Sequence, residues 1–139
     1  MVAGLRWLSA RADGWSPNWK SQALGTYILP VKSKNPLTIW QNADRLARVI
    51  QDNNVQLVHA RSRAPAWSAL WAARHTNIPF VTTYHGFYNQ KTRLKAFYNS
   101  VMARGDKVIA NSHYTANLIA ERHPDSKSRI VTVLSLIHI

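Results

Sequence analysis

Three short apolar runs each lead into polar residues that could bind a ligand. The run at 55–60 is followed by an Arg-Ser-Arg sequence, the run at 80–84 by a His-Gly pair, and the run at 107–111 by a serine. The residues concerned are Arg61, Ser62, Arg63, His85, Gly86 and Ser112. Segments long enough for one helix separate the runs, which predicts βαβ units and a parallel sheet. Ligands of such sheets bind outside the carboxyl ends of the strands, where these residues fall.

The His85-Gly86 pair is the strongest candidate for chemistry. A histidine side chain can donate, accept or shuttle a proton near neutral pH, and glycine lets a ligand approach the backbone. The alternative is structural, with His85 at the end of a strand and Gly86 in a turn. Position alone leaves the two interpretations balanced.

The other candidates at this edge are anion-binding groups. Arg61 and Arg63 can bind phosphate or carboxylate through their guanidinium groups, and Ser62 adds a hydroxyl. Ser112 directly follows a strand and can open a helix whose free N–H groups attract an anion. Each has a simpler alternative, a solvated basic loop for 61–63 and an ordinary helix cap for Ser112.

Basic and aromatic residues alternate between 87 and 104. This pattern suits single-stranded nucleic acid or a membrane interface, whereas the alternative is a core helix with a charged outer face. We expect a mixture of core packing and interfacial use. The residues are Lys91, Arg93, Lys95 and Arg104, with Phe87, Tyr88, Phe97 and Tyr98.

The length, cysteine content and net charge of the chain exclude some classes of protein and favour others. The chain has 139 residues, enough for one domain, and no cysteine, which excludes disulfides and thiol chemistry. Eighteen Lys+Arg against six Asp+Glu give a formal charge of +12, so anionic partners are expected. His59, His85 and His113 lack the spacing of a metal site, and we expect no metal. No apolar run is long enough to span a membrane.

Local signals predict where the elements begin and end. Strands are expected at 27–31, 55–60, 78–85, 107–111 and 129–133. Asn35-Pro36 predicts the start of a first helix, Pro65 the start of a second and Ser112 the start of a fourth. Gly105 is the expected C-cap of the third helix. Residues 1–24 show no periodicity. The expected buried faces are Leu37, Trp40, Ala43, Ala47 and Ile50 in the first helix, Ala66, Trp67, Ala69, Leu70 and Ala73 in the second, and Leu94, Phe97, Val101 and Met102 in the third.

Six segments together resemble one known family. They lie at 29–31, 35–39, 58–67, 79–86, 98–106 and 108–112, and the match spans about 25–133. The chain is similar to the bacterial glycosyltransferases of family 4, of GT-B fold, notably those that build lipopolysaccharide core or similar surface glycans. The resemblance is to their N-terminal, acceptor-side domain, which is Rossmann-like with helices flanking a parallel sheet.

The resemblance implies a hexosyltransferase-like activity that moves a sugar from a nucleotide-sugar donor to a glycolipid or surface-glycan acceptor, with retention of configuration. It implies no cofactor and no metal, and a nucleotide-sugar donor that is bound mainly by a second domain. His85 matches the catalytic histidine that reaches the donor sugar, and Gly86 allows close approach. The acceptor-side loop corresponds to Arg61, Ser62 and Arg63, and Lys91 and Ser112 are further candidates for substrate binding. The implied location is cytoplasmic, peripheral at the inner face of the cytoplasmic membrane.

The two ends of the chain depart from the family. Residues 1–24 lack the expected Gly-Gly loop, and 134–139 resemble a frame-junction scar. We therefore expect an irregular or foreign segment at 1–24, a partial glycosyltransferase domain at 25–133 and a non-native tail at 134–139. Without a donor domain the chain should be inactive alone. Two rival hypotheses remain: a basic nucleic-acid-binding α/β module, although no nucleic-acid motif occurs, and a non-catalytic scaffold.

Overall fold

The structure is a computed structural model that describes residues 7–8, 35–86, 88 and 92–134. Within these residues a parallel sheet has the order β1-β2-β3-β4-β5. Its strands are β1 (Trp7–Leu8), β2 (Leu57–Ala60), β3 (Phe80–Tyr84), β4 (Lys107–Ala110) and β5 (Ile130–Thr132). The predicted Rossmann-like α/β class is thereby confirmed, whereas the strand expected at 27–31 lies outside the described residues.

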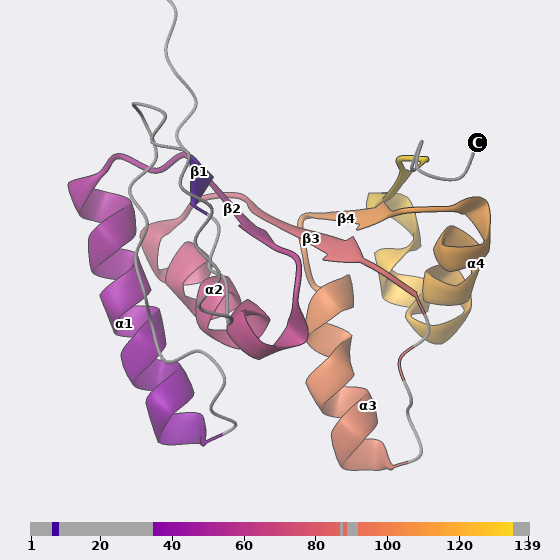
Figure 1. Ribbon diagram of the computed structural model, residues 1–139, viewed down its shortest axis with the longest axis horizontal. Helices are drawn as coiled ribbons and strands as arrows, with labels where there is room; N and C mark the ends of the chain where they lie inside the picture. The colour runs from indigo at the N-terminus through magenta and orange to yellow at the C-terminus, as the bar shows by residue number, and fades with distance from the viewer. Residues whose placement is uncertain (1–6, 9–34, 87, 89–91, 135–139) are drawn as a thin grey trace, which may run out of the picture.

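Helices connect successive strands along one side of the sheet. They are α1 (Pro36–Asp52), α2 (Arg63–Thr76), α3 (Arg93–Ser100) and α4 (His113–Arg122), with short 3₁₀ helices η1 (Val101–Ala103) and η2 (Pro124–Arg129). Strands added in sequence order, with right-handed crossovers, place their helices on the same face. Figure 1 shows α1, α2 and α3 together below the strands. Helices α2 and α4 therefore begin near the carboxyl ends of β2 and β4, whereas α3 begins farther from the sheet, after a longer loop that follows β3.

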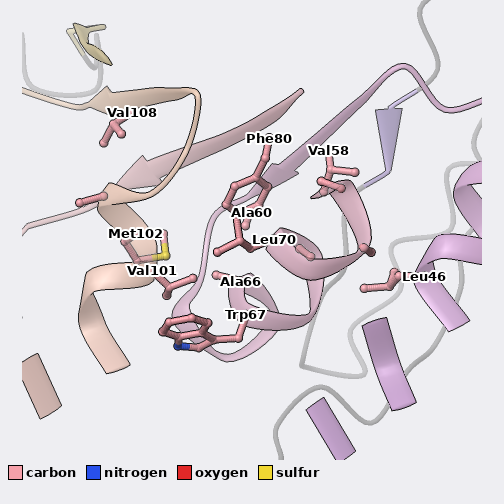
Figure 2. Close-up of a cluster of buried hydrophobic side chains, with 14 of the residues drawn as sticks. Leu46, Val58, Ala60, Ala66, Trp67, Leu70, Phe80, Val101, Met102 and Val108 are labelled. Atoms are coloured by element: carbon pink, nitrogen blue, oxygen red, sulfur yellow. The ribbon is translucent and has the colours of Figure 1, made fainter. Parts of the chain in front are cut away.

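The core lies between this face of the sheet and α2. Ala66, Ala72 and Ala73 are fully buried, and their small side chains let α2 approach the strands. Phe80 and Val108 fill the space above α2 from β3 and β4, and Figure 2 shows them together with the other core side chains. All five residues expected to face inward from the second helix are buried.

Local chemistry explains the helix starts. The Asn35 carboxamide oxygen accepts the Leu37 N–H at 3.0 Å, and Pro36 occupies the first turn of α1. At α4 the Ser112 hydroxyl oxygen accepts the Thr115 N–H at 3.1 Å. Both predicted caps are confirmed. The second helix begins at Arg63 rather than Pro65, because proline is tolerated throughout the first turn and need not mark its first residue.

One expectation for the end of an element was wrong, and the segment without periodicity contains a short strand. Residues 1–24 do contain a strand, since Trp7–Leu8 pairs in parallel with Leu57 and Val58. A two-residue strand is too short to show an alternating pattern. Gly105 is not a left-handed cap, because Arg104 caps η1. A Cβ on Gly105 would lie 2.5 Å from the Lys107 carbonyl oxygen, so close packing explains this glycine.

The predicted apolar faces of α1 and α3 were also wrong at one end of each helix. Leu37 and Trp40 in the first turns of α1 are exposed, as are Leu94 and Phe97 in α3. Periodicity identifies a face of a helix, but the first turns of these two helices extend past the layer that buries the rest of that face.

Candidate functional site

The candidate site follows the carboxyl ends of β2 and β3. Arg61 comes directly after β2, and His85 directly after β3. Their strands are neighbours, with Ala60 opposite Thr82. Partial burial and then the positive charge of Arg61 lower the pKa of His85.

His85 presents an exposed imidazole at this edge. Its pKa is lowered from the ordinary value of 6.5, first by partial burial and then by Arg61. The ring is therefore mostly neutral at pH 7, with one nitrogen that donates and one that accepts a hydrogen bond. Gly86 has φ of 138°, a conformation that residues with a Cβ rarely adopt. A hypothetical Cβ there meets no atom within 4 Å, so the backbone is open to a ligand.

His59 lies within β2 rather than at its end. Its Nε2 lies 2.7 Å from the Thr83 hydroxyl on β3, so the pair joins the two strands. Burial, Arg61 and His85 each lower the pKa of His59, in that order of size. Since alternate strand residues share a face, His59, Thr83 and His85 lie on the same side of the sheet. His59 therefore links the two strands beneath the site, whereas His85 is exposed and can contact a ligand.

Tyr88 joins the loop after β3 to three other parts of the domain. The Arg63 guanidinium carbon lies 4.6 Å from the centre of its ring, and the Tyr84 ring lies 4.5 Å away, centre to centre. Its carbonyl oxygen accepts a hydrogen bond of 2.8 Å from Arg122 on α4. Burial raises the pKa of Tyr88, while a backbone hydrogen bond at His85 and the charge of Arg63 oppose that rise. Tyr88 therefore fixes the loop that carries His85.

Arg63 is held by the protein on both sides. Besides its contact with Tyr88, its Nη1 donates to the side-chain oxygen of Asn99, a buried residue of α3, at 2.7 Å. Arg61 and Ser62 are instead exposed, and the Ser62 side chain makes no capping bond to α2. The Arg-Ser-Arg sequence thus divides into two solvent-facing residues and one that braces the site.

Of the remaining candidates, Ser112 follows β4, the strand that pairs with β3. Ser112 caps α4 and also donates a hydrogen bond of 2.9 Å to the Thr115 hydroxyl, so its side chain is used within the helix start. Lys91 lies outside the described residues. Within the part of the chain that the structure describes, no three His, Asp or Glu side chains converge as metal ligands. No helix in that part is long and apolar enough to cross a membrane.

Sequence patterns did not single out Tyr88, Asn99 or Arg122 as parts of the site. Two hydrogen bonds that hold them join residues 34 and 36 positions apart, Arg122 with Tyr88 and Arg63 with Asn99. The nearest signal in the sequence is the place of Tyr88 three residues after His85. With these residues in place, the fold defines a Rossmann-like domain whose candidate ligand-binding edge lies at the carboxyl ends of β2 and β3.

Comparison with known proteins identifies the family of this domain. The model of Glycosyltransferase Family 4 matches residues 8–135, which is most of the chain. A glycosyltransferase from Rickettsia africae ESF-5 has a similar structure, with a TM-score of 0.61 and 39% sequence identity over 81% of this chain. The match covers 28% of the rickettsial chain. No curated protein matches closely enough to count as a relative.

The chain therefore belongs to glycosyltransferase family 4. It spans a little over a quarter of the length of the rickettsial protein that it matches.

Proposed function

We propose that this chain is the acceptor-side domain of a retaining, hexosyltransferase-like enzyme. The enzyme moves a sugar from a nucleotide-sugar donor to a glycolipid or surface-glycan acceptor of the lipopolysaccharide-core type. The observation that carries the proposal is the exposed His85-Gly86 pair at the carboxyl end of β3, inside the span that matches the family. The same edge is where ligands of parallel α/β sheets bind.

The electrostatics of His85 suit a sugar ligand. Sugar hydroxyls both donate and accept hydrogen bonds, and a neutral imidazole can do the same. Arg61 favours this neutral form because its charge lowers the pKa of His85. Gly86 adds an open backbone approach beside the ring. On this proposal His85 contacts the donor sugar, and the Tyr88 loop keeps it in place.

The exposed groups before α2 suit the acceptor. Arg61 and Ser62 face solvent one strand away from His85, and a guanidinium with a hydroxyl can bind a phosphorylated glycan. Lys91 and Ser112 remain proposed substrate contacts, although Ser112 already serves α4. No metal or cofactor is proposed, and the donor nucleotide is expected to bind mainly to the rest of the enzyme.

Because the proposed acceptor is a glycolipid and the proposed donor is a nucleotide sugar, we place the enzyme at the inner face of the cytoplasmic membrane. The basic composition of the chain supports this location, since its charge of +12 attracts anionic surfaces.

The test is sugar transfer by an intact glycosyltransferase that carries residues 8–135 of this chain. A panel of labelled nucleotide sugars is offered with lipid-linked glycan acceptors, and the anomeric configuration of the product is read by NMR. We expect transfer with retention, and no transfer by the 139-residue chain alone. An inverted product, or release of sugar only to water, would contradict the proposal.

A further inference from the structure

His85 lies between two tyrosines whose rings contact one another. Tyr84, the last residue of β3, is fully buried, and its ring centre lies 4.5 Å from that of Tyr88. The exposed imidazole of His85 and the open backbone of Gly86 occupy the short stretch between the two rings. We call Tyr84 and Tyr88 the tyrosine pair. The position of the imidazole therefore depends on what holds this pair.

Two arginines from different helices hold the tyrosine pair. Arg63 of α2 places its guanidinium carbon 4.6 Å from the centre of the Tyr88 ring, and Arg122 of α4 donates to the Tyr88 carbonyl oxygen at 2.8 Å. Burial and then its ring neighbour raise the pKa of Tyr84, while the charges of both arginines oppose that rise. A side chain from each of two helices thus contacts the residue that closes the stretch carrying His85.

The bond from Arg122 restrains the main chain, whereas the contact from Arg63 restrains a ring. A hydrogen bond from a charged donor is stronger than one between neutral groups, and here the acceptor is a backbone oxygen. The donor belongs to α4, which follows β4, and β4 pairs with β3 through four residue pairs. Arg122 therefore ties the main chain three residues after His85 to the helix that follows the neighbouring strand.

We propose that Arg122 is a positioning residue for His85, because its bond to the Tyr88 carbonyl oxygen sets where the imidazole stands at the edge of the sheet. The effect on sugar transfer rests on the proposed function, in which His85 contacts the donor sugar. An exposed ring moves with the main chain that carries it, and a misplacement of about 1 Å can lower turnover about 100-fold. Arg122 itself does not need to touch a substrate.

Arg129 on η2 provides a matched control for Arg122. Its Nη1 donates to the Gly105 carbonyl oxygen at 2.7 Å, so it is also a half-buried arginine bound to a backbone oxygen. Gly105 precedes β4 at the amino end of that strand, whereas His85 follows the carboxyl end of β3. Glutamine at either position removes the same charge and the same kind of bond, but only Arg122→Gln releases the stretch that carries His85.

The first measurement is an NMR spectrum of the His85 ring in the 139-residue chain, with folding checked by circular dichroism. Arg122→Gln should shift the ring-proton signals, and Arg122→Lys, which keeps a donor and the charge, should shift them less. Arg129→Gln should leave them unchanged while it lowers the melting temperature by a similar amount. If Arg122→Gln does not fold, Arg122→Lys decides alone. Unchanged His85 signals in the folded Arg122 variants, or an equal shift in Arg129→Gln, would overturn the proposal.

The second measurement is sugar transfer by an intact glycosyltransferase that carries residues 8–135 of this chain. Arg122→Gln should lower kcat at least about 10-fold and change KM for the nucleotide sugar less than about 3-fold. Combined with His85→Ala, it should cause no further loss, because Arg122 acts only through the imidazole. Losses that multiply, or an equal loss of kcat in Arg129→Gln, would overturn the proposal. If His85→Ala alone keeps full activity, the proposed function fails, whereas the NMR comparison still decides whether Arg122 places the ring.

Discussion

Replacing Arg63 by alanine should destabilise the domain, because the side chain of Arg63 makes two contacts near the candidate site and both are lost. One is the 2.7 Å hydrogen bond to the buried Asn99, and the other is the guanidinium contact with the Tyr88 ring. A hydrogen bond from a charged donor contributes about 1.5–3 kcal/mol, and a cation–π contact at a partly exposed site about 0.5–1 kcal/mol. Arg63 is only half-buried, and ordering its long side chain costs entropy, so we expect a net loss of about 2 kcal/mol.

The assay is urea unfolding followed by tryptophan fluorescence, with Arg61→Ala as the matched control. Arg61 is an exposed arginine two residues away, and its loss should change the free energy of unfolding by less than about 0.5 kcal/mol. A double-mutant cycle between Arg63→Ala and Tyr88→Leu should give a coupling energy of about 1 kcal/mol. Equal effects of the two arginines, or zero coupling with Tyr88, would refute the bracing role of Arg63.

Three further outcomes follow from the geometry. Gly105→Ala should cost about 3 kcal/mol of unfolding free energy, because the new Cβ would lie 2.5 Å from the Lys107 carbonyl oxygen; a wild-type melting temperature would show that the backbone adapts. Arg61→Ala should raise the pKa of His85 in an NMR titration, since the charge that lowers it is removed, and an unchanged midpoint would disprove that coupling. The unfolding free energy should fall as pH drops through about 6.5, because histidines with lowered pKa values, His59 and His85 among them, bind protons more readily when unfolded. Melting curves between pH 8 and pH 5.5 check this sign, and greater stability at the acid end would contradict it.

The elements predicted correctly are those set by local chemistry. Asn35 and Ser112 each cap a helix through a side-chain oxygen that reaches an N–H two or three residues ahead, so the signal is contained in a few adjacent residues. The apolar runs at β2, β3 and β4 likewise follow from the local sequence, because each strand needs apolar residues for the face that packs on the helices, such as Val58 and Ala60 of β2.

The errors concern features that depend on distant parts of the chain. Leu37 and Phe97 fit a buried helical face by spacing, yet the layer that would cover them does not extend to the first turns. Gly105 is required by the neighbouring Lys107 backbone and Thr82 side chain rather than by a turn. Tyr88 belongs to the site through contacts with Arg63 and Arg122 that no local pattern encodes. The positions of Arg61 and His85 at the ends of neighbouring strands could be predicted from the sequence. The residues that fix the surrounding loop, such as Tyr88, could not.

The role of His85 is tested most directly by sugar transfer in an intact glycosyltransferase that carries residues 8–135 of this chain, with His85→Ala compared against His59→Ala. His85→Ala should lower turnover about 100-fold, as expected for loss of a positioned polar group in a site, while the melting temperature stays near that of the unchanged enzyme. His59→Ala should lower the melting temperature through loss of its contact with Thr83 and leave turnover less affected when assayed below that temperature. Full activity of His85→Ala would contradict the assignment of His85 as the residue that contacts the donor sugar. A larger loss of turnover in His59→Ala than in His85→Ala would contradict it as well.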